Sequence, residues 1–294
     1  MKYDIIIPTI FRDYPFLKKV VDHIVQNLCP ETIFIITNFD KSKYISKSVL
    51  NNPKCIVIDE DCLLDGLSFN KVQKLLSKRG FSSRPGWYYQ QFLKMGFSLS
   101  NYAQNDYYLS WDSDTLPLRP LKMFDSDGSP FFTMKSEYHQ PYFDTIYRLI
   151  GTKKMNKKSY IAENMLFNKT IMKELIQIIE ETKAEGEKWF EKIISSIDQG
   201  EEFGFSEFET YGTFCLQKHP NLYHERELSS FRLGGFIQGR LVSKSILKAL
   251  SYDIDIISFE PTHIPPFPWS IINRMYYYYL KKKERIIERF SYNI

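Results

Sequence analysis

Two aspartates one residue apart form the strongest chemical signal in the sequence. Asp112-Ser113-Asp114 follows directly after 107–111, an apolar and aromatic run. Two carboxylates at this spacing reach one ligand where the chain leaves extended geometry, with Ser113 as a further contact, and carboxylate oxygens suit Mg²⁺ or Mn²⁺. A cation held by Asp112 and Asp114 would neutralise charge that grows on a diphosphate as a bond to it breaks. The structural alternative is an Asx-type turn that ends the strand.

A second polar group lies around the start of a predicted helix, 87–99. Arg84 precedes this helix, and Gln90, Gln91 and Lys94 lie within it. Arg84 and Lys94 carry positive charge that counters phosphate. Residues four apart share a helix face, whereas neighbours diverge by about 100 degrees, so we expect Gln90 and Lys94 to face one ligand. The alternative is that the polar residues of this helix are simply solvated.

Two glutamates are candidates for a general base. A hydroxyl that attacks a reacting carbon must lose its proton, and a nearby carboxylate can accept it. Glu207 and Glu209 lie at a predicted helix start, which favours their ionised forms. Ser206 and Glu209 also fit the capping-box pattern, so Glu209 has a structural alternative and Glu207 is preferred. Glu163 is a weaker candidate on the acceptor side, and a retaining enzyme would require no such base.

Two further loops supply candidate contacts. His263 lies in the constrained segment Pro261-Thr262-His263-Ile264-Pro265, which would fold back over the site and bring a metal or phosphate contact. Arg12, after the first predicted strand, is a candidate for binding the donor. Its neighbour Asp13 has an alternative role as the N-cap of the following helix.

Strands and helices that alternate along the chain must position these groups. The run 3–7, ended by Pro8, predicts a buried strand. Apolar residues at helical spacing predict a helix over 14–28. Further strands are predicted at 32–37, 54–58, 107–111, 130–134 and 164–167, and further helices at 69–77, 169–185, 189–197 and from Ser206. This order predicts an α/β fold with a mostly parallel sheet, whose ligands bind beyond the carboxyl ends of the strands.

These motifs together resemble the GT-A (Rossmann-like) fold of nucleotide-sugar-dependent glycosyltransferases. The segments 84–94 (RPGWYYQQFLK) and 206–212 (SEFETYG) are similar to motifs in bacterial glycosyltransferases of surface-polysaccharide biosynthesis. The resemblance covers about residues 1–260. It implies Pro8, Thr9 and Asp40 near the nucleoside, Asp112 near the ribose or metal, and Asp114 as a metal ligand.

Composition and charge limit the cellular context. The 43% hydrophobic content excludes disordered and collagen-like classes, and four cysteines without metal-type spacing predict reduced thiols. No stretch approaches the roughly 18 consecutive apolar residues of a membrane span, and the apolar run near Met1 is too short for a signal peptide. We therefore expect a cytoplasmic protein. The formal charge is +4, and 271–291 alone contains six basic and two acidic residues. A balanced body argues against nucleic-acid binding.

The chain end predicts a separate helical extension. Residues 266–294 combine an apolar and aromatic stripe with a basic block, and 1–265 would form the GT-A-like domain. Such a helix suits an anionic membrane surface, at the inner face of the cell membrane, with a lipid-linked glycan as acceptor. The alternative is a helix packed on the body.

The favoured hypothesis is a Mn²⁺- or Mg²⁺-dependent transfer of sugar from a nucleotide-sugar donor, a UDP-sugar being expected, to a glycan hydroxyl. The expected product is a bacterial surface polysaccharide, with inversion slightly favoured. One rival is a sugar-phosphate nucleotidyltransferase, which needs a glycine-rich phosphate loop that residues 8–13 lack. Another is a catalytically silent, membrane-associated adaptor of the same fold.

Overall fold

A computed structural model describes residues 1–81, 83–154 and 157–291, with the backbone alone for 283–291. Its central sheet has five strands in the order β3-β2-β1-β4-β7. The strands are β1 (Tyr3–Pro8), β2 (Ile33–Thr37), β3 (Cys55–Asp59), β4 (Tyr107–Trp111) and β7 (Asn164–Asn168). All neighbours are parallel except β4 and β7. The predicted α/β class with a mostly parallel sheet is therefore confirmed.

Successive residues of the strands supply two separate cores, one on each face of the sheet. In β1, Ile5 and Ile7 belong to one apolar cluster and Ile6 to the other, and all three are fully buried. Strands buried on both faces read as continuous apolar runs rather than alternating ones. This is why the short runs of Ile and Phe predict these strands well.

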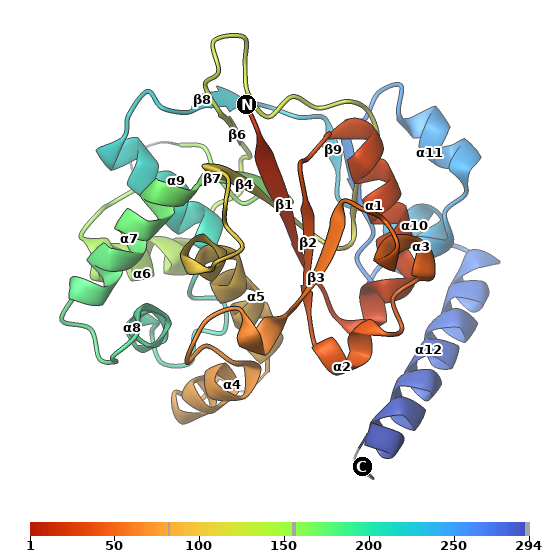
Figure 1. The fold of residues 1–294 in the computed structure, drawn as a ribbon, viewed down its shortest axis with the longest axis horizontal. Helices are drawn as coiled ribbons and strands as arrows, with labels where there is room; N and C mark the ends of the chain where they lie inside the picture. Colours follow the sequence, from red (N-terminus) through yellow and green to blue (C-terminus); the bar gives the residue numbers. More distant parts are fainter. Residues whose placement is uncertain (82, 155–156, 292–294) are drawn as a thin grey trace.

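Helices cover both faces of the sheet, as Figure 1 shows. One core packs against α1 (Tyr14–Asn27), α3 (Lys47–Leu50) and α11 (Lys244–Leu250). The other core packs against α4 (Phe69–Lys78), α5 (Pro85–Gly96), α6 (Gln140–Ile150), α7 (Lys169–Glu181), α8 (Trp189–Ser196) and α9 (Glu207–Lys218). No sequence pattern predicts α6, and α5 and α7 end earlier than the predicted helices 87–99 and 169–185.

Two small sheets pair distant segments of the chain, and one of them borders the end of β4. One contains β5 (Thr115–Pro117), β10 (Ile256–Ser258) and β9 (Ser230–Phe231), and the other pairs β6 (Phe131–Thr133) with β8 (His224–Arg226). β5 begins directly after Asp114, and its Thr115 pairs with Ser258 of β10. The late part of the chain therefore borders the acidic turn. Shorter helical segments are α2 (Phe39–Ser42), α10 (Gly235–Gln238), η1 (Phe11–Asp13), η2 (Glu60–Cys62), η3 (Phe97–Leu99) and η4 (Gly239–Leu241).

The chain ends in α12 (Trp269–Ser291), the longest helix of the described residues. Its first half packs beside η1 and η4, and its second half projects from the body (Figure 1). Asn273 of α12 is buried and donates to the carbonyl of Gln238 at 2.9 Å. Among the described residues, no helix is both long and apolar enough to cross a membrane.

Candidate active site

Two adjoining pockets open at the carboxyl ends of β1, β2 and β4. The larger, about 630 Å³, contains Trp87, Phe69 and Tyr89 and is called here the aromatic pocket. The smaller, about 300 Å³, contains Asp112 and Asp114 and is called the acidic pocket. The residues common to both walls are Arg12, Asp13, Trp87, Gln90 and Ser113. This is the sheet edge at which the sequence predicts a ligand site.

Asp112 and Asp114 lie in a turn that closes directly after β4. The amide of Thr115 donates to the carbonyl of Asp112 at 3.2 Å, so the backbone itself closes the turn. The Asp114 carboxylate accepts from the Thr115 hydroxyl at 3.2 Å, and the Asp112 carboxylate accepts from Lys94. Both side chains face the acidic pocket. In the described part of the chain, neither carboxylate accepts the backbone hydrogen bond that the alternative Asx-type turn requires.

Asp114 lacks a compensating positive partner. Within residues 1–81, 83–154 and 157–291, no cationic side chain lies at ion-pair distance from it. Burial and the nearby Asp112, Asp13 and Glu260 carboxylates, against a lowering by Arg240, together raise the pKa of Asp114 to about 7. A carboxylate in these surroundings gains from a cation. The oxygen donors of Asp112 and Asp114 therefore fit a divalent ion.

Lys94 connects the acidic turn to the start of α9. Its ammonium lies 3.1 Å from Asp112 Oδ1 and 3.0 Å from Glu207 Oε1, over the ring of Phe208. The lysine side chain is only 5% exposed. Burial by itself lowers the pKa of Lys94, but Asp112 and Glu207 outweigh it and the pKa is raised above its usual value. Lys94 is therefore a fixed cation between two carboxylates.

The N-terminus of α9 holds Glu207 in the wall of the acidic pocket. Ser206 is the N-cap, and its hydroxyl accepts from the amide of Glu209 at 3.3 Å. The amide of Glu207 donates to Gln91 Oε1 at 3.0 Å, so α5 and α9 are tied together beside the pocket. Glu207 is buried, and its carboxylate pairs with Lys94.

Glu209 lies on a different side of α9. Its carboxylate accepts from the hydroxyl of Ser159 and, at 2.9 Å, from the amide of Tyr160, and Lys154 lies 3.9 Å away. The side chain is fully buried, which raises its pKa, and it lines neither pocket. Only one half of the capping box is formed in the described residues. Ser206 accepts from the amide of Glu209, but the Glu209 carboxylate accepts from the 159–160 loop and not from the amide of Ser206. This carboxylate fixes the 159–160 loop against α9.

Asp13 holds two arginines at the junction of the pockets. Arg240 Nη1 lies 2.5 Å from Asp13 Oδ1, and Arg12 Nε lies 3.3 Å from the same oxygen. Ser113 donates to Asp13 Oδ2 at 3.4 Å. Asp13 occupies the N-cap position of α1, as the alternative reading expects, but its side chain makes no capping hydrogen bond there. Its ion pair with Arg240 links the early and late parts of the site.

The aromatic pocket is lined by polar groups from three strand ends. Pro8 is the last residue of β1 and Thr9 follows it, while Thr37 is the last residue of β2. The Thr37 hydroxyl donates to the carbonyl of Thr9 at 2.7 Å. Glu60 lies at the far wall, where burial and the Asp61 and Asp59 carboxylates raise its pKa to about 7. The predicted residues Pro8, Thr9, Arg12 and Gln90 all line this pocket.

Besides Glu209, the predicted site residues Asp40, Arg84 and His263 lie outside both pocket walls. Asp40 is exposed on α2, and Arg84 lies over the ring of Phe203 at 4.5 Å before α5. His263 stacks on Phe236, with ring centroids 4.6 Å apart, and its Nε2 lies 4.0 Å from Glu260. The structure therefore gathers Asp112, Ser113, Asp114, Lys94 and Glu207 in one pocket. It does not bring His263 into contact with them.

Sequence reasoning missed Arg232 of the acidic pocket. Arg232 Nε lies 3.0 Å from the buried carboxylate of Glu163, and Lys135 lies 3.5 Å from its other oxygen. Arg232 follows a two-residue strand with no chemical motif around it. Only the pairing of β9 with β10 places it beside β4, and no local pattern signals that pairing.

A group of three possible metal ligands lies elsewhere. Asp125, Asp127 and His224 each offer one possible ligand atom, and these three atoms lie within 4.8 Å of one another. Among the described residues, this is the group of three or more His, Cys, Asp or Glu side chains close enough to share an ion. Phe124, beside Asp125, contacts Tyr3 at the start of β1. The group therefore lies at the opposite end of the sheet from Asp112 and Asp114.

Comparison with solved structures finds similar chain paths at low sequence identity. Mouse xyloside xylosyltransferase 1 has 9% identity and a TM-score of 0.46, covering 90% of this chain and 100% of its own. The galactosyltransferase LgtC has 11% identity and a TM-score of 0.38, covering 95% of each chain. The glycosyltransferase GlyE of Streptococcus pneumoniae has 12% identity and a TM-score of 0.40, covering 98% of this chain and 64% of its own. At these values the likeness concerns the arrangement of the chain and not its activity.

A search of curated proteins finds no match. One family model matches residues 4–230, which include every strand of the central sheet and all the acidic-pocket residues except Arg232. The chain belongs to this family, described as a family of unknown function (DUF6492).

Proposed function

We propose that this protein is a GT-A-like glycosyltransferase that moves a sugar from a nucleotide-sugar donor to a hydroxyl of a glycan acceptor. One observation carries the proposal. The turn of Asp112 and Asp114 faces a pocket that shares a wall with an aromatic pocket and contains Glu207 on another wall. Transfer from a nucleoside-diphosphate donor needs three features in this order: a pocket for the nucleobase, a place for the phosphates and a carboxylate that removes the proton of the acceptor.

The aromatic pocket suits the nucleoside of the donor. Trp87 and Phe69 offer ring faces, and Thr9 and Thr37 present polar groups at the ends of β1 and β2. Ser113 and Arg12 belong to both pockets, so a diphosphate reaching from one pocket to the other would pass them. Arg12 supplies charge that pairs well with phosphate.

Asp112 and Asp114 would hold a divalent cation, Mn²⁺ or Mg²⁺. When bound, such an ion stabilises the negative charge of a departing nucleoside diphosphate. The protein contributes two oxygen donors, one of which, on Asp114, is without a cationic partner in the described part of the chain. Lys94 pairs with one oxygen of Asp112 and thereby fixes the orientation of that carboxylate.

Glu207 is the proposed base for an inverting transfer. Its carboxylate takes the proton of the acceptor hydroxyl as the hydroxyl oxygen bonds to the anomeric carbon. The bond from that carbon to the diphosphate oxygen breaks, and its electron pair leaves with the nucleoside diphosphate. Lys94 and the backbone bond to Gln91 keep Glu207 in the pocket wall.

A thermal-shift panel tests this function. UDP, GDP, CMP and TDP are added with and without Mn²⁺, and UDP is expected to give the largest shift. A ligand at 100 times its Kd stabilises the fold by about 2.7 kcal/mol. With about 2.1 cal/mol/K of unfolding entropy for each of 294 residues, this corresponds to a rise in Tm of about 4 °C.

Variants assign that shift to the acidic turn. Asp114→Asn should remove the Mn²⁺-dependent part, whereas Asp65→Asn, at an exposed aspartate outside both pockets, should keep it. An undiminished shift in Asp114→Asn, or none with any nucleotide in the unchanged protein, would reject the proposal.

The acceptor is proposed to be a bacterial surface glycan carried on lipid, with α12 as the membrane contact. Ile271, Met275 and Tyr279 are exposed and four residues apart, so they form one apolar stripe along the helix. Arg274 and Lys281 are exposed beside it. Apolar side chains flanked by cations suit the surface of an anionic bilayer.

Vesicle sedimentation tests the membrane contact. The triple variant Ile271→Ser, Met275→Ser, Tyr279→Ser should lose binding to vesicles that contain phosphatidylglycerol, because it removes the stripe without touching the packed face of α12. A matched variant with exposed apolar residues changed elsewhere, Leu50→Ser and Ile56→Ser, should bind normally. Equal binding by both variants would show that α12 does not dock on the bilayer.

A further inference from the structure

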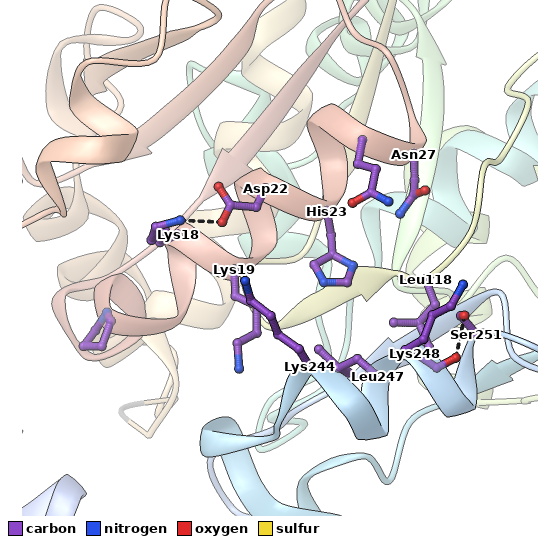
Figure 2. Close-up of a pocket in the computed structure, with 12 residues that line it drawn as sticks. Lys18, Lys19, Asp22, His23, Asn27, Leu118, Lys244, Leu247, Lys248 and Ser251 are labelled. Carbon is purple, nitrogen blue, oxygen red and sulfur yellow. Dashed lines mark hydrogen bonds and ion pairs between the residues drawn. The ribbon is translucent and has the colours of Figure 1, made fainter.

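A third cavity, of about 690 Å³, lies away from both pockets, between α1 and α11. It is called here the basic groove. Lys18 and Lys19 of α1 and Lys244 and Lys248 of α11 line it, and the single acidic residue in its wall is Asp22. Figure 2 shows the four lysines around the opening, with Lys18 directed to Asp22. The groove therefore carries a clear excess of positive charge.

The positive charges of the groove are poorly compensated by the protein. Lys18 pairs with Asp22 at 2.5 Å, and Lys19 donates to the carbonyl of Val242 at 2.7 Å. In the portion of the chain that the structure describes, Lys244 and Lys248 have no carboxylate at ion-pair distance. Burial lowers the pKa of Lys19, and the nearby Lys244 lowers it further. Cations gathered from two helices in this way favour an anionic ligand.

A small cavity under α12 lies between the basic groove and the acidic pocket and shares lining residues with both. That cavity, about 220 Å³, shares Pro15 and Lys19 with the basic groove and Arg12 with the acidic pocket. Tyr276 and Tyr277 of α12 form part of its wall. Lys19 and Arg12 thus mark a path, with rings along it, from the proposed reaction site to the lysines.

The dimensions of the path favour an extended chain over a flat surface. The groove follows α1 from Pro15 to Asn27, which is about 18 Å at 1.5 Å per residue. A bilayer surface could not enter a concave groove between two helices, whereas a glycan strand fits it. Tyrosine rings suit the apolar faces of sugars, and lysines suit their carboxylates or phosphates.

We propose that the basic groove binds the anionic part of the acceptor, a glycan that bears carboxylate or phosphate groups. This inference rests on the proposed function, because it treats the acidic pocket as the place of transfer. It assigns Lys19, Lys244 and Lys248 to acceptor selection. The acceptor hydroxyl would lie in the acidic pocket while the preceding sugars extend along the path to the groove.

Binding of a model glycan tests this assignment without donor or metal. The probe is an oligogalacturonate, and its neutral control is the same oligomer with carboxylates reduced to alcohols. The double variant Lys244→Gln/Lys248→Gln is compared with Lys74→Gln/Lys78→Gln, an exposed pair at the same spacing on α4. A phosphorylated mannan oligomer, in a second arm, separates phosphate from carboxylate recognition.

We expect the unchanged protein to bind a charged probe and not the neutral one. The α11 variant should bind about tenfold more weakly, since two modest charge pairs are lost, and the α4 variant should not change. Equal weakening in both variants, or binding of the neutral oligomer alone, would overturn the assignment. Loss of binding to phosphatidylglycerol vesicles in the α11 variant, with oligomer binding intact, would also overturn it and indicate a membrane contact.

The nucleotide thermal shift separates this inference from the proposed function. It is measured on the same α11 variant, whose lysines lie outside both site pockets. A retained shift with lost glycan binding supports the acceptor groove. Retained glycan binding in the α11 variant rejects the groove while leaving the donor site standing, and a missing shift in the unchanged protein rejects the transferase.

Discussion

Replacing Lys94 with methionine should make the protein unfold more easily. Lys94 lies between the carboxylates of Asp112 and Glu207, at 3.1 and 3.0 Å, and is 5% exposed. Glu207 is 6% exposed and Asp112 is 34% exposed. Removing one partner of a buried pair costs about 3–5 kcal/mol, and a pair nearer the surface costs about 1 kcal/mol or less. We therefore expect a loss of about 4 kcal/mol at pH 8.

The raised pKa of Lys94 keeps it charged from pH 5 to 8, so its contribution in the unchanged protein is constant over that range. In Lys94→Met the two carboxylates lose the cation that lies between them, and their mutual repulsion adds to the loss of stability.

Urea denaturation of Lys94→Met and of the double variant Lys94→Met/Glu207→Gln checks this reasoning. The double variant should recover at least 1 kcal/mol at pH 8, because the buried negative charge is gone. Lys74→Met, at an exposed lysine of α4, is the control and should cost less than about 0.5 kcal/mol. A loss below 1 kcal/mol for Lys94→Met, or no recovery in the double variant, would refute the proposed charge arrangement.

Three other substitutions test separate features of the fold. The pKa of Glu60 is raised to about 7 in the folded protein, so the protein loses stability as the pH rises from about 4.5 through 7. Thermal unfolding at each pH should therefore show that Glu60→Gln adds up to about 3 kcal/mol at pH 8 and nothing at pH 4. Gly212→Ala places Cβ 2.4 Å from the buried ring of Tyr160, so calorimetry should show a loss of about 1–3 kcal/mol despite better helix propensity. Ser206→Ala removes the cap of α9 and should cost about 0.5–2 kcal/mol in urea; an unchanged midpoint would contradict that cap.

The strands of the central sheet and most of the long helices follow from the sequence because their apolar patterns are strong. The sequence predicts a strand over 107–111, and β4 spans the same residues. The predicted helix over 14–28 ends one residue earlier, at Asn27. In each case a continuous or periodic apolar run decides the local structure and then packs into a core.

The parts of the site that depend on distant pairing could not be predicted. Arg240 and Asp13 are 227 positions apart and meet in an ion pair, and no pattern near either residue indicates the other. The Lys94 bridge likewise needs both β4 and the start of α9 in place. Single positions such as Glu209 also depend on one loop, because Ser159 and Tyr160 determine which way its carboxylate faces.

The placement of His263 shows a limit of motif reasoning. The strand before its constrained loop does reach the site, since the amide of Phe259 donates to the carbonyl of Asp114 at 2.8 Å. The His263 ring itself stacks on Phe236 and approaches Glu260. Closeness in sequence to the site therefore does not bring the most reactive side chain of the loop into it.

Manganese binding followed by electron paramagnetic resonance tests the central claim most directly. Mn²⁺ is titrated into the protein with and without UDP, and loss of the free-ion signal reports the bound fraction. The account predicts one nucleotide-enhanced site that disappears in Asp112→Asn/Asp114→Asn and persists in Asp125→Asn/Asp127→Asn, whose side chains lie at the other end of the sheet. Binding that survives in the first variant and vanishes in the second would contradict it.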